Sequence, residues 1–389
     1  MGFAKRHSLR IERIARLVAQ PSVSSSVAAL DQSNRGVIDL LADMLDCVGF
    51  RVEILPLPNA PHKANLIATF GRGQGGLVLA GHTDTVPYDA ALWNSDPFKL
   101  QVRDGKLYGL GAADMKAFLA LALEAVSGLD ADTLRAPLIV LATAEEETTM
   151  EGARALVELQ RPKARHAIIG EPTDMRAVRA HKGHLVHQLR VVGRSGHSSD
   201  PRLGSNAIDG MTRVLGALME LREALASRYH DASFALPMPT LNFGRIRGGD
   251  NANRICGDCE LDLDVRLVPG MELDWVRDEI SRVAIEALAG TGLLLEQRPL
   301  DHGVPPYQVA AQSELLRTLE ELTGEGAESV AFGTEAPYFA ALGMDTMVLG
   351  PGSIEQAHCP DEFVRADRLE PTVQMLQAVA DRLCKTAPR

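Results

Sequence analysis

The sequence has few of the features that mark several large classes of protein. It has only five cysteines in 389 residues, odd in number and scattered, which is typical of a reducing compartment and not of a disulfide-stabilised fold. Cys256 and Cys259 have the C-x-x-C spacing of a zinc or redox pair, but no second cysteine pair accompanies them and they fall in a strand-like segment. We therefore expect buried structural thiols there.

The sequence also lacks a long apolar run and a cluster of basic residues. No window approaches the ~20 apolar residues that span a bilayer, and the run at residues 118–123 ends at Glu124. The first twenty residues carry five Lys and Arg and no apolar segment, so we expect no secretory signal and a cytoplasmic location. With a net charge of −11, we expect small-molecule partners, and neither a nucleic acid nor a membrane.

What remains is a globular composition, 46% hydrophobic and 23% charged, in a chain long enough for two domains. Strand and helix patterns alternate over residues 1–180 and again over 299–389, which predicts a doubly wound α/β catalytic domain with a mixed sheet. Between them, residues 181–298 have the order βαββαβ, which is typical of the ferredoxin-like unit. The sequence therefore predicts an α+β domain inserted into an α/β domain.

Candidate chemistry centres on residues 81–87 (Gly-His-Thr-Asp-Thr-Val-Pro), which follow the apolar run 77–80. The apolar run predicts a buried strand, which places His82 at the carboxyl edge of a sheet, where ligands bind in open α/β folds. An imidazole there could bind a metal, with the Asp84 carboxylate accepting a hydrogen bond from its other ring nitrogen. A loop histidine followed by a turn aspartate fits this heptapeptide equally well.

Further acidic and histidine positions follow apolar strands or lie at loop ends. They are Asp114, the run Glu145 to Glu147, Glu171 and His358. Singly, each has an ordinary explanation: a helix cap, a solvated acidic loop, a turn acid before a proline and a surface histidine. Together, two histidines and several carboxylates at one sheet edge match the nitrogen and oxygen ligands of zinc.

Several motifs, in one order and over nearly the whole chain, resemble the dinuclear zinc aminoacylase and carboxypeptidase family. The matching segments are residues 81–87, Asp-Met-Lys at 114–116, Glu-Glu-Thr at 146–148, Gly-Glu-Pro-Thr at 170–173, Gly-His-Ser-Ser at 196–199, residues 253–266, and Gly-Thr-Glu-Ala-Pro at 333–337. The predicted insertion agrees with that family's dimerisation or lid domain, so the resemblance implies a homodimer.

The resemblance also implies two divalent metal ions, zinc or cobalt, in one site. In this chain Asp114 would bridge the two ions. His82 and Glu171 would complete one ligand shell, and Glu147 and His358 the other. Two such ions activate water for attack on a carbonyl group.

The family pattern at the general base is Asp-Glu-Glu, in which the middle residue is the base and the last is a ligand. Three consecutive glutamates leave this register open to a slip of one residue. Alignment on Thr148 makes Glu146 the base and Glu147 the ligand, and leaves Glu145 as a solvated loop acid. Buried near other carboxylates, the base should have a raised pKa.

The resemblance implies substrate roles for residues outside the metal motifs. His197 matches a histidine that stabilises the oxyanion in the partner subunit's active site. Asn253 and Arg266 match a segment that grips the substrate carboxylate, although Arg266 could instead form a structural ion pair. Glu335 could bind a distal ammonium, or could simply be an acid in the first turn of a helix capped by Thr334.

The reaction implied is metal-dependent hydrolysis of an N-acylated amino acid. N2-acetylornithine is the expected substrate, with N-succinyl-diaminopimelate or a dipeptide as alternatives on the same scaffold. A non-catalytic binding protein of this fold would be expected to lack the base or a metal ligand, and this sequence has all of them.

Overall fold

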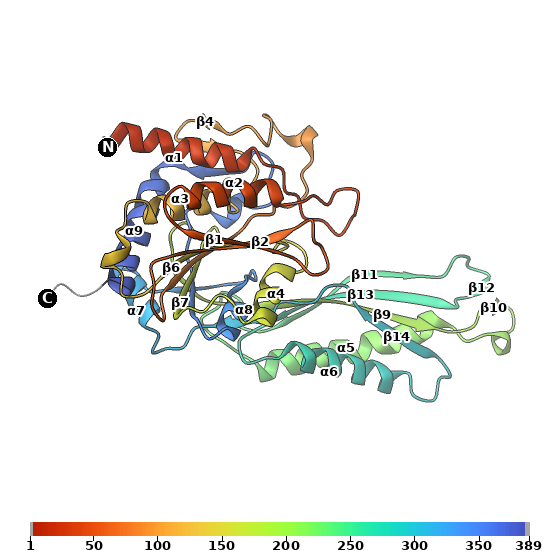
Figure 1. Ribbon diagram of the computed structural model, residues 1–389. Coiled ribbons are helices and arrows are strands. Elements are labelled where there is room, and N and C mark those ends of the chain that lie inside the picture. The colour runs from red at the N-terminus through yellow and green to blue at the C-terminus, as the bar shows by residue number, and fades with distance from the viewer. Residues whose placement is uncertain (1–2, 386–389) are drawn as a thin grey trace. The chain divides into compact units, whose positions relative to one another are not determined.

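The computed structural model describes residues 3–385 and divides into two compact units (Figure 1). Unit 1 comprises the residues up to 179, residues 309–328 and the residues from 334 onward. Unit 2 comprises residues 180–308 and 329–333, so it extends beyond residue 298. None of the helices within residues 3–385 is both long and apolar enough to cross a membrane.

Unit 1 is built on a mixed sheet. Its strands lie in the order β1 (Arg51–Pro56), β2 (Ala64–Phe70), β6 (Leu138–Thr143), β3 (Leu77–His82), β7 (His166–Ile169), β17 (Asp345–Val348) and β8 (Val178–His181). β3 runs parallel to β6 and β7, whereas β1 and β2 are antiparallel to their neighbours. Every residue of β3, β6 and β7 is buried, because these apolar strands are covered on both faces.

Helices cover the two faces of this sheet (Figure 1). Packed together on one face are α1 (Phe3–Val18), α2 (Arg35–Asp46), α3 (Lys116–Val126) and α9 (Ala366–Cys384). On the other are α4 (Glu151–Leu159) and α8 (Ala336–Ala341), and α7 (Glu314–Thr323) packs on β17. α3 is apolar nearly all round because it lies between the sheet and the two helices α1 and α9.

Two helices begin before the residue that local sequence signals favour as their start. Ser8 is a suitable helix cap and Pro371 a suitable first-turn residue, but α1 begins at Phe3 and α9 begins at Ala366, with Pro371 inside it. A proline removes one backbone donor, and Asp367 in the first turn of α9 favours the earlier start because it meets the helix dipole. Capping and proline signals therefore located both helices but misplaced their first residues.

Unit 1 also contains a small, separate three-stranded sheet. It consists of β18 (Phe363–Arg365), β5 (Lys106–Tyr108) and β4 (Gln101–Arg103). Asp104 and Gly105 join β4 to β5 with φ angles of 53° and 72°, as the two-residue turn of a tight hairpin requires. Pairing of β18 with β5 ties the C-terminal segment that carries His358 to the segment that leads to Asp114.

Unit 2 contains the βαββαβ series. Its elements are β9 (Gly183–Val192), α5 (Ala207–Arg228), β11 (Thr240–Gly248), β13 (Asp258–Leu267), α6 (Leu273–Ala287) and β14 (Leu294–Pro299). The antiparallel sheet has the order β11-β13-β9-β14, and α5 and α6 pack against it (Figure 1). β13 alternates buried and half-buried residues along its length, as a strand with one covered face does.

Further short strands lie in unit 2 and where the two units divide. β10 (Gly196–His197) pairs with β12 (Arg254–Ile255). The boundary between the units falls within β8, which also pairs with β15 (Tyr307–Gln308) and β16 (Glu328–Val330). Cys256 and Cys259 are buried free thiols, as the sequence predicted.

Candidate metal centre

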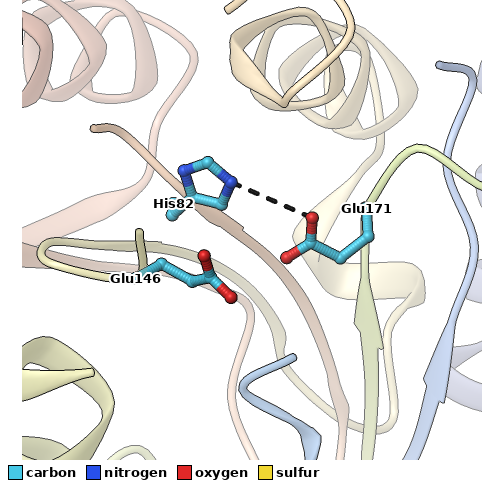
Figure 2. Close-up of side chains that lie close together, drawn as sticks. All are labelled: His82, Glu146 and Glu171. Atoms are coloured by element: carbon cyan, nitrogen blue, oxygen red, sulfur yellow. Dashed lines mark ion pairs between the residues drawn. The ribbon is translucent and has the colours of Figure 1, made fainter. Parts of the chain in front are cut away.

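Several of the predicted ligands lie where neighbouring strands of unit 1 end. His82 is the last residue of β3, Glu146 and Glu147 follow β6, and Glu171 follows β7. Because β6 and β7 both run parallel to β3, these ends meet at one edge of the sheet. Figure 2 shows the His82 ring and the carboxylates of Glu146 and Glu171 directed into one shared space.

Asp114 lies between two histidines. His82 Nε2 is 2.9 Å from Asp114 Oδ1, and His358 Nε2 is 3.6 Å from Asp114 Oδ2. His82 Nε2 is also 3.9 Å from Glu171 Oε2, and His358 Nε2 is 3.0 Å from Glu147 Oε2. Each oxygen of one carboxylate thus faces a different imidazole, which is the arrangement expected of a bridging ligand.

Among residues 3–385, possible metal-donor atoms gather in two groups of three, and the atoms of each group lie within 4.8 Å of one another. One group is His82, Glu146 and Glu171, and the other is His82, Asp114 and Glu147. This division differs from the predicted shells, because Glu146 stands among the donors and His358 belongs to neither group. His358 is also more exposed than the others, at 56% of its side chain. Its hydrogen bond to Glu147 raises the pKa of its imidazole to about 9.

The cluster contains more acidic than basic side chains. Burial raises the pKa of Glu146 well above its usual value, and the charge of Glu171 raises it further. Burial likewise raises the pKa of Glu171. Burial alone would lower the pKa of His82, but its contact with Asp114 and the charge of Glu171 raise that pKa well above its usual range. An environment that disfavours ionised carboxylates is one that a bound cation would stabilise.

The donor set fits a divalent metal ion. Glu171 Oε1 is buried and has no hydrogen-bond partner among the described residues, although buried carboxylate oxygens are ordinarily paired. Imidazole nitrogens and carboxylate oxygens are the ligands of zinc and of neighbouring transition metals. Five such side chains, with Asp114 shared, are enough for two ions.

The predicted hydrogen bond between the His82 ring and the Asp84 carboxylate is wrong. His82 Nδ1 lies 3.0 Å from the backbone carbonyl oxygen of Asp84 and 3.8 Å from its Oδ1, because the carbonyl occupies the position facing the ring. The Asp84 carboxylate instead accepts hydrogen bonds from the backbone N–H groups of Glu146 and Glu147, at 3.3 and 3.1 Å. Asp84 therefore orients the ring through its backbone and fixes the acidic loop through its side chain.

Glu145 is not the solvated loop acid that was predicted. Its side chain is only 12% exposed, forms an ion pair with Lys63, and accepts hydrogen bonds from Ser24 and Thr148 at 3.0 and 2.9 Å. Burial favours a raised pKa for Glu145, but the bonds from Lys63 and Thr148 outweigh it and lower that pKa. Of the three consecutive glutamates, Glu145 is thus occupied elsewhere, and Glu146 is the first that joins the cluster.

Glu335 is a fully buried acid. It immediately precedes α8, is 0% exposed, and accepts a 3.0 Å hydrogen bond from Thr143, the last residue of β6. Its other oxygen, Oε1, has no partner among the described residues. Burial raises the pKa of Glu335 to about 7. A surface acid in the first turn of a helix would have neither this burial nor this pKa.

The remaining predicted residues belong to unit 2. His197 ends β10, is exposed, and accepts a hydrogen bond at Nδ1 from the Ser199 backbone. Asn253 is exposed too. Arg266 lies in β13 and forms an ion pair with Asp264 at 3.0 Å. Within unit 2, therefore, none of these three side chains is held by a buried network in the way that His82 is.

Two residues of this region were missed by the sequence analysis. Lys63 pairs with Glu145, and Glu362 accepts hydrogen bonds from the loop before Asp114. Lys63 is 82 positions from Glu145, and Glu362 is 248 positions from Asp114. The only local signal was the place of Glu362 four residues after His358, directly before the short strand β18.

Known sequences resemble this chain over most of its length. The sequence model of peptidase family M20/M25/M40 matches residues 78–382. A protein named acetylornithine deacetylase from Pasteurella multocida (strain Pm70) is 47% identical over 374 residues, covering 96% of this chain and 98% of the relative. One of the same name from Proteus mirabilis (strain HI4320) is 46% identical over 374 residues, covering 96% of each chain.

Solved structures share the fold at low sequence identity. A tripeptidase from Staphylococcus aureus has a TM-score of 0.74 at 19% identity, covering 96% of this chain and 98% of its own. A protein from Bacillus subtilis described as a dinuclear metal binding peptidase has a TM-score of 0.69 at 16% identity, covering 98% of this chain and 99% of its own.

Proposed function

Because the chain belongs to peptidase family M20/M25/M40, we propose that it hydrolyses N2-acetyl-L-ornithine to L-ornithine and acetate with two divalent metal ions. The observation that carries the chemistry is the buried cluster around His82, with Glu146 among the donor atoms. The identity of the acyl amino acid is inferred from the relatives at 46–47% identity that are named acetylornithine deacetylase. Release of ornithine assigns the reaction to arginine biosynthesis.

The ions would be held by His82, Asp114, Glu147, Glu171 and His358, with Asp114 shared between them. We assign zinc to both positions, and cobalt is compatible with the same donors. Bound ions would polarise the amide carbonyl and lower the pKa of water near them. The contacts of Asp114 with both histidines support the sharing, and the unpaired oxygen of Glu171 supports its place in the ligand set.

Glu146 is the general base in this proposal. Its carboxylate takes a proton from the attacking water, whose oxygen forms a bond to the acetyl carbon. The same carboxyl group then donates that proton to the leaving nitrogen of ornithine as the carbon–nitrogen bond breaks. Burial among acids, which raises the pKa of Glu146, suits a group that must hold the proton between these two steps. The backbone bonds to Asp84 keep Glu146 oriented.

Residues of unit 2 and Glu335 would bind the substrate. His197 would stabilise the oxyanion in the active site of a second copy, which makes the enzyme a homodimer with unit 2 as its dimerisation or lid domain. Arg266 and Asn253 would hold the α-carboxylate. Glu335 would bind the distal ammonium, for which its unpaired buried oxygen is a suitable acceptor. The free state of all five cysteines supports a cytoplasmic location.

A substrate panel with metal restored tests the function. N-acetylornithine, N-acetylcitrulline, N-succinyl-diaminopimelate and a dipeptide are compared by kcat/KM, before and after a chelator. We expect N-acetylornithine to be preferred and hydrolysis to stop with the chelator. A preference for the succinyl substrate or the dipeptide would show that N-acetylornithine is not the substrate. Full activity after metal removal would show that the hydrolysis does not depend on metal.

A further inference from the structure

Glu362 is a buried carboxylate that the reaction described above does not use. It lies between His358 and strand β18, and it is 2% exposed. Its Oε2 accepts a hydrogen bond from the backbone N–H of Gly111 at 2.9 Å. Its Oε1 accepts two more, from Ala113 at 2.6 Å and from Asp114 at 3.0 Å. One carboxylate thus binds three amides of a four-residue loop.

Three of the four amides in the loop at residues 111–114 bond to Glu362. The loop lies between β5 and α3, and its own backbone bonds are those of the Ala112 N–H to the Gly109 carbonyl oxygen at 3.0 Å and of the Lys116 N–H to the Gly111 carbonyl oxygen at 2.8 Å. A buried backbone amide left without a partner costs free energy comparable to a lost hydrogen bond, so these three bonds stabilise the loop whatever the charge on Glu362. The Glu362 backbone adds a fourth bond, because its carbonyl oxygen accepts from the Gly109 N–H at 3.0 Å. Most of the hydrogen bonds made by the amides of this loop therefore come from Glu362.

The two segments that Glu362 joins each carry a residue assigned to metal binding. Asp114 is the last residue of the loop, and His358 lies four residues before Glu362. Asp114 Oδ2 and His358 Nε2 are 3.6 Å apart, so a small shift of the loop would change that distance directly. Partners that orient metal ligands typically change metal affinity by about 10–100-fold when they are lost.

We propose that Glu362 is a positioning residue that fixes Asp114 relative to His358 and so sets the metal affinity of the site. The inference rests on the proposed function, which supplies the roles of Asp114 and His358. Glu362 does not contact substrate and moves no proton. It acts by holding the backbone from which Asp114 projects.

The test is metal affinity in Glu362→Gln, measured by competition with a chelating dye for zinc alone, without substrate. The amide oxygen can keep the Ala113 and Asp114 bonds, but the new NH2 group faces the Gly111 N–H, so two donors oppose each other. We expect zinc to bind about 10–100-fold more weakly. At saturating zinc, kcat should be reduced and KM for N-acetylornithine should stay within about two-fold.

Asp345→Asn is the matched control. Asp345 is another carboxylate of unit 1 that holds backbone, because it accepts bonds from Ser313 Oγ at 2.7 Å and from the Leu315 N–H at 3.3 Å at the start of α7. It should lower Tm without changing zinc affinity. Equal loss of zinc affinity in both variants would reduce Glu362 to a general stabilising role and overturn the inference. Unchanged zinc affinity in Glu362→Gln and in the shorter Glu362→Asp would overturn it as well.

Amide hydrogen exchange on the unmodified chain decides the question even if the Glu362 variants do not fold. The amides of Gly111, Ala113 and Asp114 should already be protected in the zinc-free protein, because Glu362 holds them without metal. Fast exchange without zinc and protection only with zinc would contradict the inference. An unmodified chain that binds no zinc would instead reject the proposed function, and the inference with it.

Discussion

The two units hold their candidate functional residues in different ways. In unit 1, His82, Asp114 and Glu171 are at most 7% exposed and contact one another. In unit 2, His197 and Asn253 are exposed, and Arg266 is paired with its neighbour Asp264. The difference agrees with the proposed roles, in which the metal site of unit 1 is preformed and the residues of unit 2 would contact substrate only when substrate or a second copy is present.

The largest effect should come from removing a metal ligand from the proposed site in unit 1. His82→Ala removes the nitrogen that faces both Asp114 and Glu171, so bound metal should fall below two ions per chain. The loss of metal should reduce kcat/KM by at least about 10³-fold, since a metal contributes several kcal/mol to such a reaction. Elemental analysis, circular dichroism and the hydrolysis assay check this together. A folded variant that keeps two tightly bound ions would remove His82 from the ligand set.

A change to His197 in unit 2 should leave the metal ions bound and remove the proposed oxyanion donor. His197→Ala should retain full metal content and lose about 10²–10³-fold in kcat. Mixed with Glu146→Gln chains, it should regain activity, because one site of each heterodimer then has both intact residues. If verified subunit exchange restored no activity, a role for His197 in a second copy would be ruled out.

Glu335 lies in unit 1, as the proposed metal ligands do, but its proposed role is to bind substrate. Glu335→Gln keeps the oxygen that bonds Thr143 and removes the charge that would meet an ammonium. It should weaken kcat/KM for N-acetylornithine by about 1–3 kcal/mol, the scale of a charged hydrogen bond, and leave N-acetylcitrulline nearly unchanged. Equal losses on the two substrates would mean that Glu335 supports the fold or the metals.

The smallest effect concerns a carboxylate of unit 1 that lies outside the cluster. Burial favours a raised pKa for Asp345, but the contacts with His166 and Ser313 outweigh it and lower that pKa. A lowered folded-state pKa contributes stability above the unfolded value, near 4, and loses it as the pH falls through the folded value. Below about pH 5, the Tm of the Asp345→Asn variant should therefore fall by a few degrees less than the Tm of the unmodified protein. Parallel Tm curves for the two proteins would contradict this contribution.

Much of the fold could be predicted from local pattern. The apolar runs before His82 and before the acidic loop predicted strands, and those strands place the residues that follow them at one sheet edge. The βαββαβ order of unit 2 was also legible from the sequence. Residue roles came from the resemblance, and they stay predictions until the variants are measured.

Long-range partners could not be predicted. The ring of His82 meets the backbone of Asp84 and not its carboxylate, and Lys63 reaches Glu145 across 82 positions. Backbone conformation decides which of the three consecutive glutamates joins the metal-donor cluster. Glu145 has a φ of 65° and forms an ion pair with Lys63, so Glu146 is the one that faces His82. No composition or spacing rule contains that information.

The central claim is that Glu146 is the base of a two-metal hydrolase, and its neighbour supplies the control. Glu146→Gln and Glu145→Gln are compared by kcat on N-acetylornithine and by metal ions per chain. We predict that Glu146→Gln keeps two ions and loses at least about 10²-fold in kcat, whereas Glu145→Gln keeps most of its activity and loses stability through Lys63. An active Glu146→Gln enzyme beside a metal-loaded but inactive Glu145→Gln enzyme would contradict the claim and move the base by one residue.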